Sequence, residues 1–207
     1  MGKTKVKKQS TFIDMTAMSD VTVLLLTFFM LTATFLPKEP VQVLTPSSVS
    51  EFKVPESNVL TILISADGKI FLNLDDYSKD VKREALKGMG RDYGMTFSDA
   101  EVRTFLEQTH IGVPMNQMHN LLKIKDTSSQ DAMIKDMGVP NDSTNNQFSR
   151  WITNIRATEK GQDLTISIKA DRTTPYPFVD GVMKSLVKMK ENRYSLVTTL
   201  RGMPDGF

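Results

Sequence analysis

The stretch Val21–Leu36 reads VTVLLLTFFMLTATFL and contains no charged residue, no Gly and no Pro. A helix of these sixteen residues would be about 24 Å long, whereas the hydrocarbon core of a bilayer is about 30 Å thick. Pro37 and Pro40, with two charged residues between them, end the helix on one side. The missing turn must come from residues before Val21, which brings Asp20 into the membrane. We therefore predict a transmembrane helix over residues 16–36.

The charges around this helix predict its orientation. Residues 1–15 form a basic tail with Lys3, Lys5, Lys7 and Lys8, so the positive-inside rule places the N-terminus in the cytoplasm and the chain from Pro37 onward on the other side. Two other interpretations remain open. A cleavable signal peptide has a similar basic start, although no A-x-A cleavage site follows here. A buried helix of a soluble domain is the second.

Asp20 is the candidate functional residue of this helix. A charged carboxylate at mid-membrane costs a few kcal/mol, which favours its protonated form or burial against protein. Thr16, Thr27 and Thr34 lie at −4, +7 and +14 from Asp20, so one face is polar and is expected to meet partner helices or a hydrated path. Thr hydroxyls can also bond back to their own helix. We predict Asp20 as a proton carrier supported by Thr27, and Asp14 as an interfacial or N-capping group.

Composition excludes several other functions. Beyond Pro37 the basic and acidic residues are equal in number, which is a poor basis for binding nucleic acid. The chain has 0 Cys and 2 His, so no thiolate chemistry is available, and we expect no metal site and no cofactor. Neither a Walker A sequence nor a G-x-S-x-G elbow is present. We therefore expect a protein that is not an enzyme.

The remainder predicts a linker and one small domain. Residues 37–57, rich in Pro and Ser, are predicted to be an extended, unpacked tether. Residues 58–207 are predicted to form an α+β domain, with a mixed sheet covered by helices on one face and a helical insertion at about 78–142. Its predicted elements are a hairpin of 59–66 and 69–74 with a two-residue Asp67-Gly68 turn, helices at 79–90, 98–109, 114–122, 130–137, 148–158 and 177–190 (Thr174 as N-cap, Pro175 at the first helical position), and strands at 164–170 and 194–200. Trp151 is predicted to lie in the core.

Three separate segments resemble one protein family. Ser19–Met30 (SDVTVLLLTFFM), preceded by FIDMT at residues 12–16, resembles the membrane segment of the ExbD/TolR biopolymer-transport proteins. Val41–Pro46 (VQVLTP) resembles the alternating segment that follows the helix in ExbD. Ile168–Tyr176 (IKADRTTPY) resembles a family motif at a strand end before a helix. The insertion has no counterpart in short family members.

The resemblance implies a function and partners. It implies an inner-membrane, single-pass protein with a periplasmic domain, in which Asp20 corresponds to an essential aspartate and the proton motive force drives a motor. Implied partners are an ExbB-like ring-forming membrane protein, a TonB-like protein and membrane lipid, and a homodimer is expected. Val41, Val43, Leu44 and Pro46 are the implied partner-contact residues. Alternatives are a TolR-like role in outer-membrane constriction, a tethered periplasmic binding domain without a motor role, and an anchored hydrolase.

Overall fold

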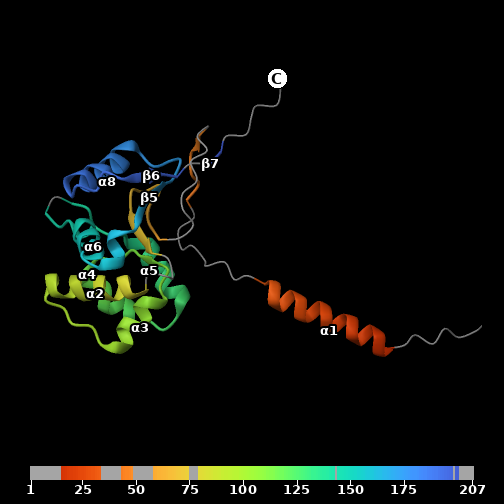
Figure 1. Ribbon diagram of the computed structural model, residues 1–207. Coiled ribbons are helices and arrows are strands. Elements are labelled where there is room, and N and C mark those ends of the chain that lie inside the picture. The colour runs from red at the N-terminus through yellow and green to blue at the C-terminus, as the bar shows by residue number, and fades with distance from the viewer. Residues whose placement is uncertain are drawn as a thin grey trace, which may run out of the picture. The chain divides into compact units, whose positions relative to one another are not determined.

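The computed structural model describes residues 15–33, 43–48, 58–74, 79–142, 144–197 and 199–200. Backbone contacts divide the chain into two compact units, Met1–Pro37 and Lys38–Phe207. The first unit contains the helix α1 (Met15–Thr32), which is red in Figure 1. The second unit contains the sheet and the remaining helices.

Helix α1 runs without interruption over Val21–Thr32 of the apolar segment, and none of its side chains is buried by protein. Residues 34–36 of the predicted transmembrane helix lie outside the described residues. It begins at Met15, so it extends five residues to the N-terminal side of Asp20. Among the described residues, α1 is the one helix that is long and apolar enough to cross a membrane.

The second unit is built on a five-stranded mixed sheet with the strand order β4-β3-β2-β5-β6. Strands β2 and β3 are antiparallel, as are β3 and β4, whereas β5 is parallel to both β2 and β6. The mixed sheet agrees with the prediction. Its strands are β2 (Val59–Ile64), β3 (Ile70–Leu74), β4 (His110–Ile111), β5 (Thr165–Ala170) and β6 (Tyr194–Leu196). The two-residue strand β4 was not predicted.

The turn between β2 and β3 is longer than predicted. Ser65 N–H donates to the carbonyl of Lys69 at 3.0 Å, which leaves three residues in the loop. Gly68 has a φ of 78°, the left-handed conformation that a three-residue hairpin loop needs at this position. The prediction of a two-residue turn is therefore wrong by one residue, whereas the hairpin itself is confirmed.

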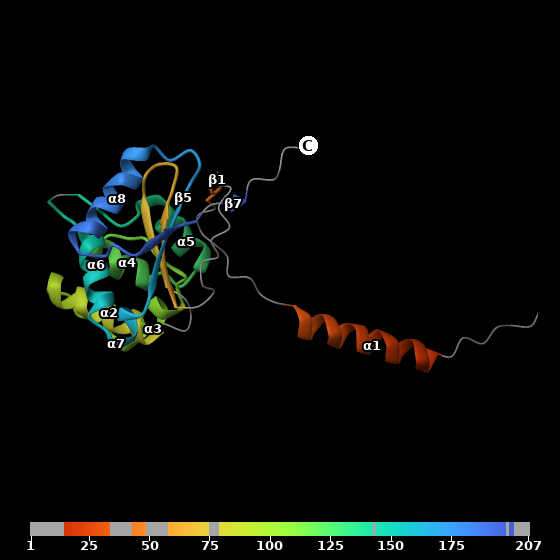
Figure 2. The same cartoon turned by 45° about the horizontal axis from the view of Figure 1, so that its top comes forward.

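Helices pack against the sheet, as predicted, but buried side chains lie on both of its faces, because Leu63 and Phe71 point away from the face of Ile62 and Leu72. The two principal helices are α6 (Gln147–Arg156) and α8 (Tyr176–Lys188), to one side of the strands in Figure 2. Their buried side chains include Trp151, which is fully enclosed and stacks on Phe105 at a centroid distance of 6.0 Å. The prediction that Trp151 belongs to the core is confirmed. The short helix α7 (Glu159–Gln162) follows α6 and was not predicted.

The insertion forms the four predicted helices. They are α2 (Lys79–Tyr93), α3 (Asp99–Glu107), α4 (Met115–Lys123) and α5 (Thr127–Met137). Ser98 and Glu101 form the predicted capping box at the start of α3. The insertion is part of the same core, because its buried side chains cluster with those of the sheet, and a Cβ at Gly112 would overlap both Phe71 of β3 and Ile134 of α5.

Two predictions near the C-terminus are wrong in detail. Thr174 is not the N-cap of α8, because its hydroxyl donates to the carbonyl of Ser65 at 3.0 Å, and Pro175 occupies the N-cap position. The predicted last strand is divided. Its first part is β6, and its second part is β7 (Thr199–Leu200), which pairs in parallel with β1 (Ser47–Ser48) in a separate two-stranded sheet.

Candidate functional site

Asp20 lies in the second turn of α1, directly before the apolar segment. No other residue of α1 is charged. Among the described residues, no hydrogen bond or ion pair to Asp20 is present. In a bilayer this carboxyl group needs a proton, a hydrated path or a partner protein, because an ion alone in hydrocarbon is strongly disfavoured.

Most hydroxyls of α1 bond to its own backbone. Ser19 donates to Met15 O at 2.8 Å, and Thr22 donates to Met18 O at 2.7 Å. Thr27 donates to Leu24 O at 2.9 Å, so its hydroxyl is satisfied within the helix. Thr27 still lies near the Asp20 face because seven residues are close to two helical turns. Its supporting role stays a prediction.

The second feature is a contact that we call the linker junction, formed by Val43 and Leu44 with Asp171, Arg172 and Thr173. Leu44 N–H donates to Asp171 Oδ2 at 3.0 Å, and Arg172 N–H donates to Leu44 O at 2.7 Å. Val43 packs into the hydrophobic core with 9% of its surface exposed. The junction brings together two segments that are 127 residues apart, both of which carry the family resemblance.

Of the predicted unpacked tether over residues 37–57, the structure describes residues 43–48, and the junction corrects the prediction for Val43 and Leu44. Val43 and Leu44 are held by the folded domain, because the N–H and the carbonyl of Leu44 each form a hydrogen bond with it and the side chain of Val43 is buried. Of the other predicted contact residues, Pro46 is exposed, whereas Val41 lies outside the described residues. Asp14 and Thr34 also lie outside them.

Asp171 is the functional candidate that sequence reasoning did not assign. Its Oδ1 accepts hydrogen bonds from the Thr173 hydroxyl at 2.6 Å and from the Thr173 N–H at 2.9 Å. These bonds, with the one from Leu44 N–H, hold the pKa of Asp171 below its usual value of 3.8. An Asp that precedes a Thr by two positions is typical of an Asx turn, so the turn could have been predicted. Its hydrogen bond to Leu44, which is 127 residues away in the sequence, could not have been predicted.

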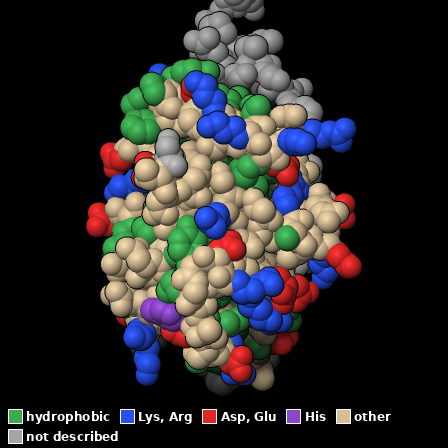
Figure 3. Space-filling view, turned by 90° about the vertical axis from the view of Figure 1, so that its left-hand side faces the viewer, with side chains coloured by type: hydrophobic (Ala, Val, Ile, Leu, Met, Phe, Trp, Pro, Cys, Tyr) green, Lys and Arg blue, Asp and Glu red, His purple; other side chains and the backbone are tan. Residues whose placement is uncertain are grey.

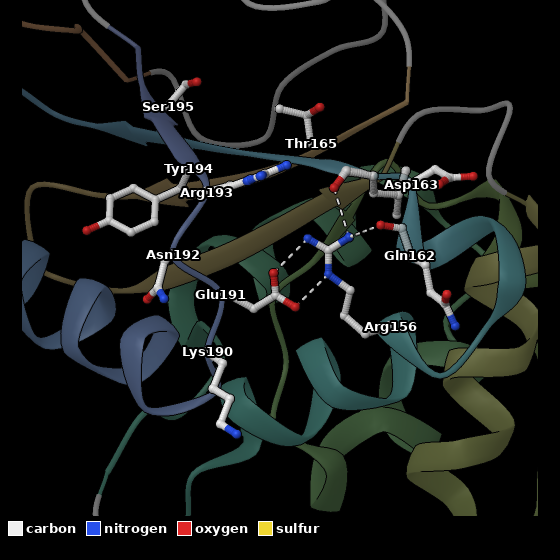
Figure 4. A pocket seen from close by; sticks show the side chains of 11 residues that line it. Arg156, Gln162, Asp163, Thr165, Lys190, Glu191, Asn192, Arg193, Tyr194 and Ser195 are labelled. Carbon is white, nitrogen blue, oxygen red and sulfur yellow. Dashed lines mark hydrogen bonds and ion pairs between the residues drawn. The ribbon is translucent and has the colours of Figure 1, made fainter.

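A second polar site lies where β5 and β6 begin. An open pocket of about 910 Å³ is lined by residues that include Asp163, Lys190 and Arg193. Figure 4 shows Arg156 beside it, with its guanidinium between Glu191 and the chain that enters β5. Arg156 binds both carboxylate oxygens of Glu191, at 2.8 and 2.9 Å.

The same guanidinium also donates to three backbone carbonyls. These are the carbonyls of Gly161 at 2.7 Å, Gln162 at 3.0 Å and Leu164 at 2.8 Å. Each of its three nitrogen atoms therefore donates to a protein group. Arg156 therefore has a structural role, because its bonds join the end of α6, the start of β5 and the segment after α8.

His119 lies beside an acidic residue of α3. In the part of the chain that the structure describes, no group of three His, Cys, Asp or Glu side chains could hold a metal ion. His119 Nδ1 lies 2.8 Å from Glu101 Oε1. Hydrogen bonds from the Ser98 backbone N–H and from His119 lower the pKa of Glu101 to about 2. This pair ties α3 to α4.

An apolar helix that is long enough to cross a membrane, followed by a small domain with a mixed sheet, matches the architecture expected of single-pass, membrane-anchored proteins. The sequence model of one such family, described as biopolymer transport protein ExbD/TolR, matches residues 7–201. Since this is nearly the whole chain, the protein belongs to the ExbD/TolR family. No curated protein and no solved structure shows significant similarity to the chain.

Proposed function

We propose that this protein is a motor subunit driven by the proton motive force, in an ExbB-ExbD-TonB-type complex of the inner membrane that powers outer-membrane transport. The observation that supports this most is the position of Asp20, the one charged residue of α1. Membership of the biopolymer-transport family supports it independently.

In the proposed cycle Asp20 accepts a proton from the periplasmic side and releases it to the cytoplasm. Each charge that crosses gains about 2.3 kcal/mol per 100 mV of membrane potential. Protonation removes the cost of moving Asp20 past apolar surface, so α1 can shift or rotate among neighbouring helices. Loss of the proton then holds the new position.

The proposed partners follow from the helix surface. A single helix cannot enclose its own carboxyl group, so other helices must surround Asp20. We propose an ExbB-like ring-forming protein in this role, with two copies of the present chain. On the periplasmic side, a TonB-like protein receives the movement, and the linker junction is where a pull from α1 reaches the folded domain.

The test replaces Asp20 by Asn, which keeps the size of the side chain and removes its titration. We expect Asp20→Asn to assemble with the ring-forming protein at the normal level and to reduce energised outer-membrane transport to the level without the gene. Asp20→Glu is the matched control, because it keeps a titratable carboxyl group, and it should retain part of the activity. Normal transport by Asp20→Asn would favour the tethered binding domain instead.

A TolR-like role in outer-membrane constriction is the alternative, since the matching family includes both types. It uses the same proton-carrying Asp20. The two are separated by the phenotype of the gene deletion and of Asp20→Asn. Loss of cargo uptake supports the ExbD-type function, whereas defective constriction with normal uptake supports the TolR-type function.

A further inference from the structure

Three exposed hydrophobic side chains lie at the end of the domain where the linker enters. Leu44 is 76% exposed, Tyr176 is 68% exposed and Phe178 is 48% exposed. We call these three residues the apolar apex. Figure 2 shows the β2–β3 turn and the connection from β5 to α8 at the same end of the domain. In Figure 3, hydrophobic side chains gather at the upper end of the face, where α8 lies.

The apex is held by rigid elements. Leu44 is fixed by its backbone hydrogen bonds to Asp171 and Arg172. The ring of Phe178 lies directly over Gly68, so closely that a Cβ there would overlap it. Tyr176 is the first residue of α8. The exposed side chains therefore do not belong to a loose loop that could fold back and bury them.

The chemistry of the apex suits a lipid surface. Tyr combines an apolar ring with a polar tip and is enriched where the hydrocarbon meets the headgroups. Leu and Phe side chains are stabilised when their apolar surface is removed from water. Charges of both signs lie beside these residues in the sequence, Asp171 with Arg172 and Asp67 with Lys69, and Lys69 lies 3.8 Å from Asp136. We therefore expect apolar contacts to contribute more than charge to the binding of the apex to a lipid surface.

The attachment of the chain favours the membrane as the occupant. Leu44 follows Ala33, the last described residue after α1, by eleven positions. Eleven extended residues reach at most about 40 Å. The chain thus confines the apex to the neighbourhood of its own bilayer, where even weak binding is effective because the encounter is intramolecular.

The apex is too small for a stable protein interface. Such interfaces bury about 800 Å² on each partner, whereas a large aromatic side chain supplies only about 150–250 Å². We propose that the apolar apex docks onto the headgroup region of the membrane in which α1 is anchored. This proposal rests on the membrane anchor and not on proton transport by Asp20.

The chain contains 0 Cys, so single cysteines can carry a fluorophore without background. The full chain is reconstituted in phosphatidylcholine vesicles with an NBD label at Leu44→Cys or Tyr176→Cys. The control is Arg91→Cys, an exposed position near the end of α2, which lies on the other side of the domain from α8 in Figure 1. Quenching by spin-labelled lipids and by aqueous dithionite is measured at low and high salt.

We expect spin-labelled lipid to lower the fluorescence at positions 44 and 176 at least twofold, with little effect at position 91 and little dependence on salt. Tyr176→Ser, which alters an exposed side chain and should not affect folding, should reduce the quenching of a label at position 44. Equal behaviour of all three labels would overturn the proposal. So would protection from dithionite without lipid quenching, which would indicate a second copy or another protein on the apex.

Discussion

At the scale of single residues, Asp171 connects the linker segment at Leu44 to the folded domain. Its two carboxylate oxygens serve different partners, because Oδ2 accepts from Leu44 N–H and Oδ1 accepts from Thr173. A force on the linker would therefore act first on this carboxylate and on the buried side chain of Val43. Thr174 adds a bond to Ser65, which extends the same connection to the β2–β3 hairpin.

We expect Asp171→Asn to weaken the junction, because an amide offers one acceptor oxygen where the carboxylate offers two. The loss should be about 1–2 kcal/mol and should appear as faster hydrogen exchange of the Leu44 amide. In the unaltered protein, the lowered pKa of Asp171 means that its stabilising effect is complete above about pH 4. It is lost as the pH falls through the lowered pKa. Asp163→Asn, at an exposed position, is the control, and equal exchange in both variants would contradict this role.

At the scale of elements, the sequence predicts most helices and strands but not the contacts that position them. The hairpin, α6, α8 and the four insertion helices follow from periodicity, Gly and capping residues. Strand β4 is only two residues long, and it forms because it pairs with the edge of β3. The pairing of β1 with β7 is likewise a long-range contact without a local pattern.

The packing of the elements around the start of β5 depends on the hydrogen bonds of Arg156. Arg156→Lys keeps the charge but cannot reproduce the planar fork that binds Glu191 and three carbonyls at once. Since both side chains of the ion pair are largely buried, we expect the free energy of unfolding to fall by about 2 kcal/mol. Denaturant unfolding followed by Trp151 fluorescence measures it. Arg103→Lys, on the exposed side of α3, should change stability by less than about 0.5 kcal/mol.

At the scale of the whole molecule, the insertion is part of the domain and not an added lobe. Val139 N–H donates to Ile70 O at 2.7 Å, and Gln147 Oε1 accepts from Met115 N–H at 2.8 Å. Such contacts explain why sequence reasoning found the insertion helices but left their role open. For the candidate site, the length of the apolar segment was enough to predict that Asp20 enters the membrane. The linker junction could not be predicted, because it depends on packing between segments that are distant in the sequence.

This integration predicts that a change between α2 and α6 affects the entire domain. Gly88 of α2 faces Asn154 of α6, and a Cβ at position 88 would overlap Asn154 Oδ1. Asn154 cannot easily move, because its amide donates to Asp92 Oδ2 at 2.9 Å and to Arg150 O at 3.0 Å. Gly88→Ala should therefore destabilise the domain by about 1–3 kcal/mol, although Ala is the better helix former.

Gly181→Ala in α8 is the matched control for Gly88→Ala, since a Cβ there meets nothing within 4 Å. It should raise stability by about 0.5–1 kcal/mol through helix propensity alone. Both variants are compared by denaturant unfolding, followed by Trp151 fluorescence and by far-UV circular dichroism. We expect Gly88→Ala to lower the midpoint equally for both signals, because α2, α6 and the sheet share one core. A separate early transition in circular dichroism, with unchanged Trp151 fluorescence, would mean that the insertion unfolds independently.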